Sequence, residues 1–440
     1  MQLHLVFLLV LCQSGKKQMP DVKLTKLPYP YKAALTICSD IDGCSFDDFM
    51  LTHQFLNSSQ ETPLGKGLGL PIGNSFWMYD KPELPNSAFS YLDPVSLKET
   101  PYAEKIDLLI QAGILDVMHG YGNFNCDFPY HRKYAEKAID VLEKKTHRIK
   151  VWTNHGGADN LQSIGQNSQG EGDVAESSQY YHADLLRKYG IEFFWDSEMN
   201  VSNIIGQDRK SHYLQGYWNN PLYHQMPNKH RQLIKGWFAV WDDILYRFRQ
   251  CHCFDWAHAN YSNELLSFEA LRDGQPFHRF KRFGHGRFDW SDDLPLLLND
   301  HVFQRLIQTG GYLILYIHLG DNKNRGKHVL SEEVIHTLRK ISDYYSNKEI
   351  WIDTTSNLLK YNKFVQNLKW SCCEKESLYT IEIEHQMNIS AEDLSGLTFE
   401  APVNKDVQVI YNGRDVYIEV FKTRNGQYAQ VPLRSIEWPF

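Results

Sequence analysis

Ionisable and metal-binding side chains follow directly on six apolar segments of this 440-residue chain. The segments and the residues that end them are AALTICS with Asp40 and Asp42, ILDVM with His119, IKVWTN with His155, IEFFW with Asp196, LILYI with His318 and EIWI with Asp353. If these segments are parallel strands of an α/β fold, their carboxyl ends lie on one face, where such folds place their sites. The sequence therefore predicts one joint site built from strand ends.

The segment SDIDG places two carboxylates two residues apart, at Asp40 and Asp42. Both can face one cavity only if the chain bends after the strand, and Gly43 permits such a bend. One carboxylate can then bind a metal, with His119 as a further ligand, while the other takes a proton from water. A divalent ion there would lower the pKa of its water and polarise a carbonyl oxygen. The alternative role for both aspartates is in a turn or a helix cap.

Seven short apolar segments bounded by turn residues predict β-strands. They cover residues 33–39, 74–79, 114–119, 149–154, 191–196, 312–318 and 349–353. Between them, apolar residues at helical spacing and terminal glycines predict helices. These helices cover residues 102–113, 131–145, 182–190, 302–311 and 331–345. The alternation predicts parallel βα units, in a barrel or an open doubly wound sheet.

The expected architecture is α/β, a distorted (β/α) barrel of about seven strands with a small C-terminal all-β domain. The barrel is placed at residues 25–365, with an insertion around 200–293 that interrupts the alternation. Residues 370–440 alternate apolar and polar side chains, which predicts a small β-sandwich-like domain. Asn412-Gly413 and Asn425-Gly426 are the expected hairpin turns within it.

Residues 1–18 carry an apolar stretch that is too short to span a bilayer and fits a signal peptide. This favours an extracytoplasmic location, secreted or periplasmic, over a cytoplasmic one, with no transmembrane span in the mature chain. The formal net charge is −7 and there is no basic run, which argues against a nucleic-acid partner. Cys251-His252-Cys253 lacks the second cysteine pair of a zinc site, so partly buried thiols are the favoured interpretation.

The strand-end motifs resemble those of the polysaccharide deacetylases of carbohydrate esterase family four, the NodB-type deacetylases. SDIDG is similar to the first family motif, which makes Asp40 the catalytic base and Asp42 a metal ligand. HGYGN is similar to the His-x-x-x-His ligand motif, with His119 matching and Asn123 in the second ligand position. LYIHLGD is similar to the final motif and implies that His318 is the general acid. The resemblance covers roughly residues 28–361.

The sequence also departs from the family pattern. Asn123 is a poorer ligand than histidine because its amide oxygen is neutral, and His155 could supply the missing nitrogen. The arginine-bearing third motif has no match, and VWTNHGG occupies roughly its place. Asp196 lies near the strand expected to carry the aspartate that tunes the general acid. Four further residues are predicted to support the site or contact the substrate, namely His155, Asp196, Trp77 and Tyr121.

The resemblance implies a metal-dependent hydrolase that removes an N-acetyl group from a glycan or amino sugar, with Zn²⁺ as the expected ion. One alternative is a glycosidase on a related barrel that pairs Asp40 with Asp196 or Glu198 and needs no metal. Another is an inactive barrel that binds glycan. The chain has no G-x-S-x-G, no P-loop and no G-x-G-x-x-G after a strand, which argues against serine hydrolases and nucleotide enzymes. The particular sugar and the oligomeric state stay open.

Overall fold

The computed structural model describes residues 21–156, 160–177, 179–196, 204–206, 233, 237, 264–321, 329–384 and 390–440. The predicted signal peptide, Glu198 and the Cys251-His252-Cys253 segment lie outside these residues. The chain divides into two compact units. The larger unit comprises Lys26–Asn367 and Leu433–Phe440, and the smaller unit comprises the chain up to Thr25 and Leu368–Pro432.

The larger unit is built on a mostly parallel central sheet in the order β10-β11-β9-β8-β7-β5-β2-β12, with β13 also paired to β2 and β6 to β5. Among the strands of the described residues, only the β10–β11 pair in this sheet is antiparallel. The strands are β2 (Ala33–Ser39), β5 (Asn74–Tyr79), β6 (Ser90–Leu92), β7 (Leu115–His119), β8 (Val151–Thr153), β9 (Phe193–Trp195), β10 (Leu266–Ala270), β11 (Pro276–Phe280), β12 (Tyr312–Ile317) and β13 (Ile350–Ile352).

All seven predicted strands are present, and the predicted α/β class is confirmed. The region predicted as an insertion also contributes, because its last part forms β10 and β11. β11 joins the sheet by pairing in parallel with β9. The chain that follows β11 then runs beside β12, where Phe283 pairs with Leu315 and Trp290 pairs with His318.

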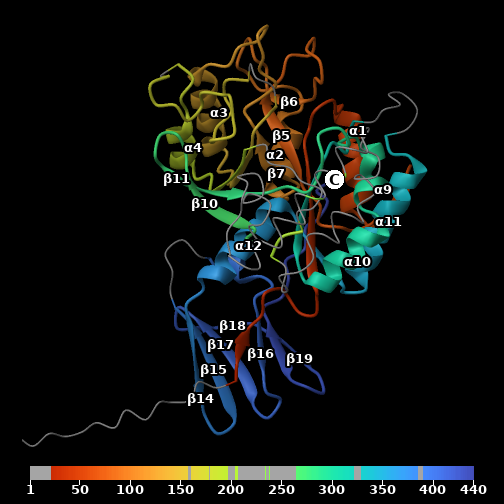
Figure 1. Cartoon of the computed structure of the whole chain (residues 1–440), viewed down its shortest axis with the longest axis vertical. Coiled ribbons are helices and arrows are strands. Elements are labelled where there is room, and N and C mark those ends of the chain that lie inside the picture. The colour runs from red at the N-terminus through yellow and green to blue at the C-terminus, as the bar shows by residue number, and fades with distance from the viewer. Residues whose placement is uncertain are drawn as a thin grey trace, which may run out of the picture. The chain divides into compact units, whose positions relative to one another are not determined.

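Helices cover the central sheet, and Figure 1 shows α2, α3 and α4 grouped apart from α1, α9, α10 and α11. Caps mark the boundaries of several helices. The Ser45 side chain caps the start of α1, and Gly310 caps the end of α10. The helices of the described residues are α1 (Phe46–Asn57), α2 (Ala103–Gln111), α3 (Arg132–Lys144), α4 (Ala183–Tyr189), α9 (Leu294–Leu297), α10 (Asp300–Thr309), α11 (Glu332–Ser346) and α12 (Thr355–Asn367).

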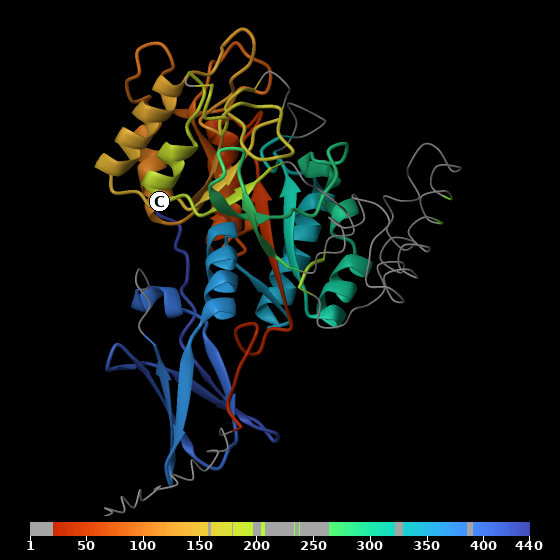
Figure 2. The ribbon, with the colours of Figure 1, turned by 60° about the vertical axis from the view of Figure 1, so that its left-hand side comes forward.

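Strand β2 is buried on both faces, as a central parallel strand must be. Its alternate residues enter different hydrophobic clusters because successive side chains point to opposite faces. Leu35 and Ile37 pack with residues of α10 and α11, whereas Ala34 and Cys38 pack with residues of α12. Figure 2 shows α12 beside β2 and β12. The sheet is therefore held from two sides, which fixes where its strand ends lie.

The smaller unit contains two four-stranded sheets, one in the order β1-β16-β20-β19 and one in the order β14-β15-β17-β18. The predicted turn at Asn412-Gly413 joins β17 to β18, with positive φ at both residues, and Asn425-Gly426 lies between β19 and β20. The strands are β1 (Lys23–Leu24), β14 (Trp370–Glu374), β15 (Leu378–Ile383), β16 (Thr398–Ala401), β17 (Asp406–Tyr411), β18 (Arg414–Val416), β19 (Glu419–Lys422) and β20 (Gln427–Gln430).

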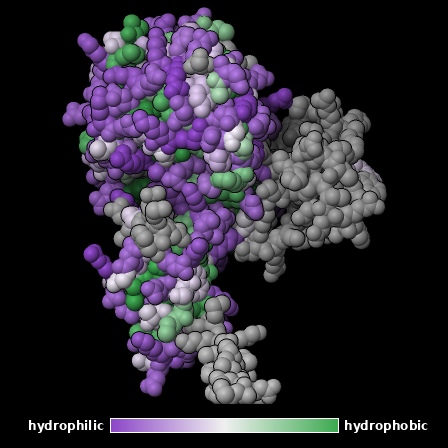
Figure 3. Space-filling view, turned by 90° about the vertical axis from the view of Figure 1, so that its left-hand side faces the viewer, coloured by the Kyte–Doolittle hydropathy of each residue, from purple (hydrophilic) through white to green (hydrophobic). Residues whose placement is uncertain are grey.

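Strand β1 pairs with β16, so the smaller unit takes residues from both ends of the chain. The segment Leu433–Phe440 belongs to the larger unit, where Ile436 and Trp438 pack against its hydrophobic core. No helix among the described residues is long and apolar enough to cross a membrane. The surface drawn in Figure 3 is mostly hydrophilic, with hydrophobic residues scattered over it.

The stability of the larger unit should fall on acidification because of His53 in α1. This imidazole is fully buried, stacks on Phe49 and lies within hydrogen-bond distance of Asn57 and Asn74. Burial lowers its pKa to about 4, below the ordinary value near 6.5 of an unfolded chain. Between pH 4 and pH 6.5 the folded state thus binds fewer protons at His53 than the unfolded state does. The contribution of His53 to stability is therefore complete above about pH 6.5 and is lost as the pH falls toward 4.

His53→Gln should therefore reduce the loss of unfolding free energy between pH 7 and pH 5 by about 2 kcal/mol, as measured by urea unfolding. The comparison with wild type cancels the effects of other groups. These include Asp116 and Asp353, where burial raises the pKa to about 7 and about 6 and the sign is opposite. An unchanged pH dependence in the variant would contradict the assignment of a neutral buried imidazole.

Candidate metal centre

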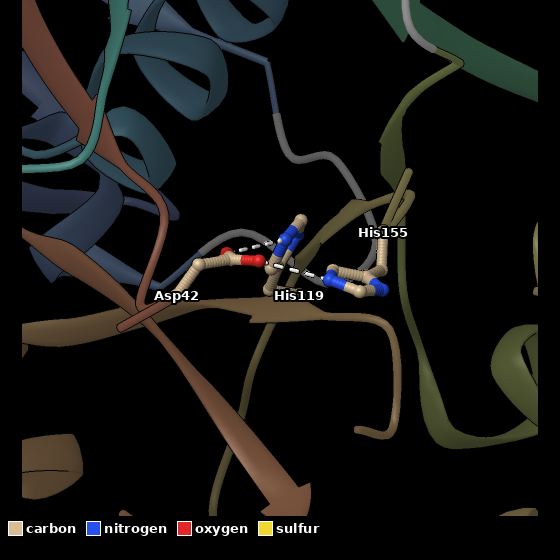
Figure 4. A group of neighbouring side chains, drawn as sticks. All are labelled: Asp42, His119 and His155. Carbon is tan, nitrogen blue, oxygen red and sulfur yellow. Dashed lines mark hydrogen bonds and ion pairs between the residues drawn. The ribbon is translucent and has the colours of Figure 1, made fainter. Parts of the chain in front are cut away.

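Asp42, His119 and His155 converge at the carboxyl ends of β2, β7 and β8 (Figure 4). His119 Nε2 lies 3.1 Å from Asp42 Oδ2, and His155 Nε2 lies 2.8 Å from Asp42 Oδ1. One ligand atom from each of the three residues lies within 4.8 Å of the others. Asp42 and His119 are buried and His155 is partly buried. The group could hold a metal ion through one carboxylate and two imidazoles.

The bend predicted after β2 is present at Gly43, which has a φ of +68°. A Cβ atom at this position would lie 2.6 Å from Asp321 Oδ2, so a larger residue would meet both backbone strain and a clash. The bend is followed at once by Ser45, whose side chain caps α1 by accepting from the amide of Asp48. Within one site, Asp40 contacts Arg282, whereas Asp42 at the bend contacts His119 and His155.

His119 is held in orientation by its second ring nitrogen and by Trp77. Its Nδ1 lies 2.9 Å from Thr153 Oγ1 on the neighbouring strand β8. The Trp77 ring stacks on His119 and meets His155 edge-on, with ring centroids 6.0 and 5.3 Å apart. Trp77 and Tyr121 are both 0% exposed. Trp77 thus packs directly on both imidazoles, whereas the Tyr121 ring packs on Trp152 and His182, and the site role of Tyr121 stays a prediction.

The side chain of Asn123 makes its hydrogen bonds to residues outside the group of Asp42, His119 and His155. Its amide Nδ2 donates to the backbone oxygen of Pro85, 3.0 Å away, and its side chain also bonds Asp80. The metal-ligand role of Asn123 stays a prediction. His155, predicted as a supporting residue that could also supply the missing ligand nitrogen, is the third member of the group beside Asp42 and His119.

The charges of the site depend on Asp42. Burial alone would raise its pKa, but the adjacent His155 and His119 hold the pKa of Asp42 well below its usual value. His318 Nε2 lies 3.6 Å from Asp42 Oδ2, next to this carboxylate but outside the three-residue group. Burial opposes protonation of His318, whereas Asp42, Asp40 and Asp289 favour it and raise its pKa to about 9.

Asp40 forms a buried ion pair that the sequence analysis missed. Arg282 Nη1 lies 2.9 Å from Asp40 Oδ1 and also donates to the Cys38 backbone oxygen at 3.2 Å. The guanidinium stacks over Trp195, 3.6 Å from the ring centroid, and over Tyr316. Arg282 is 0% exposed. Arg282 lies in the aromatic and basic segment PFHRFKRF, which falls within the region predicted as an insertion, so the strand-end pattern did not indicate it.

Asp289 also lies in the region predicted as an insertion, and the sequence did not indicate its contact with His318. Its backbone oxygen lies 3.0 Å from His318 Nδ1 and accepts from the His318 amide at 2.7 Å. The hydroxyl of Tyr316 donates to the Asp289 carboxylate at 3.2 Å. The segment after β11 thus supplies a partner for both predicted catalytic residues, Asp40 and His318.

Two of the predicted strand-end residues lie in other settings. Asp196 accepts from Arg279 at 2.7 Å and from Asn167 at 2.8 Å, so both of its oxygens are occupied. Asp353 is placed by the register of β13, where Ile352 pairs with Leu35. It is therefore level with Thr36 of β2, about 13 Å along the strand from Asp40. Its carboxylate instead accepts from the amide of Thr354 at the start of α12.

The chain matches no protein-family model, and its comparison with curated proteins finds no match.

If His155 rather than Asn123 is the third ligand, metal binding should depend on His155 and be insensitive to loss of the Asn123 side chain. Asp42→Ala, His119→Ala and His155→Ala should each weaken binding of Zn²⁺ by roughly 100-fold or more, because each removes a ligand atom. Asn123→Ala is the matched control, since it removes only the hydrogen bonds to Pro85 and Asp80. Competition with a chromophoric chelator gives the dissociation constants. A loss in Asn123→Ala as large as in His155→Ala would overturn this ligand set.

Loss of Arg282 should destabilise the larger unit by about 3–5 kcal/mol, because Arg282→Met leaves the Asp40 carboxylate buried without its counter-charge. The double variant Asp40→Asn/Arg282→Met should recover part of this loss, since the neutral amide has a smaller desolvation cost. Chemical denaturation of both variants measures the difference. Equal unfolding free energies for the two variants would show that the ion pair is not what the arginine stabilises.

Proposed function

We propose that this chain is a metal-dependent hydrolase that removes an N-acetyl group from a glycan or amino sugar. We also propose that it is a divergent member of the NodB-type polysaccharide deacetylases. The observation that carries the proposal is the arrangement around Asp42. Two imidazoles adjoin this carboxylate, and Asp40 and His318 lie next to the same group. A related proposal is that the central sheet closes as a distorted barrel through residues 281–290, which run beside β12.

The donor set fits Zn²⁺. Catalytic zinc sites combine imidazole and carboxylate ligands in threes and keep one position open, as Asp42, His119 and His155 would. When bound, the ion would lower the pKa of a coordinated water, polarise the amide carbonyl and balance the charge on its oxygen in the transition state.

Asp40 is the proposed general base. Its Oδ1 lies 3.8 Å from His119 Nδ1 and is held from the other side by Arg282. The arginine fixes the carboxylate next to the ligand group, where it can take the proton of the attacking water. Arg282 is therefore a candidate for the arginine of the family's third motif, for which the sequence offered no match.

His318 is the proposed general acid. An amide nitrogen leaves poorly unless it is protonated, and an imidazole in its charged form can supply that proton. The Nδ1 of His318 faces the Asp289 backbone oxygen, so Nε2 is the atom that faces Asp42 and the reacting group. The neighbouring carboxylates favour the charged imidazole, which agrees with this role.

The two alternatives have less support. A glycosidase would pair Asp40 with Asp196 or Glu198; Asp196 is already bonded to Arg279 and Asn167, and Glu198 lies outside the described residues. An inactive glycan-binding protein would not require Asp40 and His318 to be held beside a group that fits a metal ion. We further propose an extracytoplasmic location, on the basis of the apolar N-terminal stretch, and a glycan rather than a nucleic acid as the substrate.

The proposal predicts that the zinc-loaded protein releases acetate from N-acetylated oligosaccharides without changing their chain length, and that chelation stops the reaction. Mass spectrometry of the products measures both. New reducing ends in the absence of metal would instead support a glycosidase. Binding of the oligosaccharides without either product would support the inactive binder.

Variants then separate the roles within the site. His318→Ala and Asp40→Asn should keep their zinc while turnover falls by roughly 100-fold or more, because each loses a proton-transfer group. Asp42→Ala should lose both zinc and turnover. If His318 only hydrogen-bonds the loop of Asp289, its replacement should lower the melting temperature and leave turnover per folded molecule nearly unchanged. Loss of zinc in His318→Ala would make His318 a ligand.

A further inference from the structure

The three imidazoles around Asp42 share one orientation. His119, His155 and His318 each direct Nε2 toward the Asp42 carboxylate, at 3.1, 2.8 and 3.6 Å. Each Nδ1 faces a different partner. For His119 this partner is the Thr153 hydroxyl, for His155 the Asn160 side-chain amide, and for His318 the Asp289 backbone oxygen.

These partners differ in what they can do. A hydroxyl and a side-chain amide can each donate or accept a hydrogen bond, whereas a backbone carbonyl oxygen only accepts. The acceptor-only partner lies on His318, so its Nδ1 must carry a proton. The two adaptable partners, Thr153 and Asn160, lie on the two imidazoles that would bind the metal.

Asn160 is the more constrained of these two. It is 1% exposed, and its Nδ2 lies 2.5 Å from His155 Nδ1 and 3.4 Å from the Gly156 backbone oxygen. Its Oδ1 is buried and has no hydrogen-bond partner among the residues that the structure describes. In this arrangement the amide donates to Nδ1, and the proton of His155 lies on Nε2, where it is donated to Asp42 at 2.8 Å.

A metal ion requires the other tautomer. An imidazole that binds through Nε2 carries its proton on Nδ1, and that N–H needs an acceptor. A candidate acceptor is the opposite end of the same amide, Asn160 Oδ1, which has no partner within the described part of the chain. A half-turn of the Asn160 amide about its terminal bond would bring this oxygen to Nδ1.

We propose that Asn160 is a positioning residue for His155 with two amide orientations, one for each tautomer of the imidazole. One orientation donates to Nδ1 while His155 bonds Asp42, and the other accepts from Nδ1 while Nε2 binds the ion. The side chain thereby sets the affinity of the site for its metal without touching it. This inference rests on the proposed metal site and adds Asn160 to it as a residue that contacts the ligand His155 and not the ion.

The test is the dissociation constant for Zn²⁺, measured by chelator competition. Asn160→Leu removes the acceptor and should weaken binding by about 10–100-fold, as loss of such a partner does for other histidine ligands. Asn160→Asp keeps an acceptor and should stay within a few-fold of wild type. Ser163→Ala is the matched control, because its hydroxyl bonds the backbone oxygen of His155 and not the ring. It should bind Zn²⁺ like wild type.

A second measurement compares two states of the wild-type protein. In ¹⁵N spectra of the wild-type protein, His155 Nδ1 should be unprotonated without metal and protonated with Zn²⁺, with His155→Gln assigning the signal. The same protonation of Nδ1 in both states would overturn the inference. So would wild-type affinity in a folded Asn160→Leu.

The two proposals can fail separately. If His155→Ala itself binds Zn²⁺ like wild type, the ligand set of the proposed function is wrong. If His155→Ala loses the ion while Asn160→Leu keeps wild-type affinity, only the role of Asn160 is wrong.

Discussion

The site depends on a carboxylate that is removed from water. Asp42 is buried, and an isolated charge there would be costly, so imidazoles from the ends of different strands must lie against it. Their contacts require β2, β7 and β8 to end at the same level of the sheet. The parallel register of these strands meets this requirement, and the bend at Gly43 turns the carboxylate toward them. The buried negative charge of Asp42 also makes the group of Asp42, His119 and His155 suitable for binding a cation.

The neighbouring carboxylate has a different partner, although it is only two residues away. Asp40 lies against Arg282, whereas Asp42 lies against His119 and His155. Charged side chains at both positions would repel each other in a low-dielectric site unless each had its own hydrogen-bonding or charged partner. This separation allows one carboxylate to stay free of the metal and act on a proton, which is the division of work in the proposed reaction.

The region between β9 and β12 shows how strongly the site depends on elements distant in sequence. Its last part forms β11, and the chain that follows carries Arg282 to Asp40 and Asp289 to His318. Aromatic rings of Trp195 and Tyr316 enclose the arginine and exclude water from the ion pair. The predicted catalytic residues are thereby held rigidly, as general acid–base catalysis requires.

The sequence by itself determined the seven strands and the residues at their ends, because buried parallel strands read as continuous apolar runs. It did not indicate α1 and α12, since a helix buried on several sides lacks a clear polar face. Only the tertiary structure placed His155 beside Asp42, separated Asp353 from the site and brought Arg282 to Asp40. Local pattern records which face of a strand is buried. Strand register and the pairing of distant segments decide which strand ends meet, and neither can be predicted from a local sequence pattern.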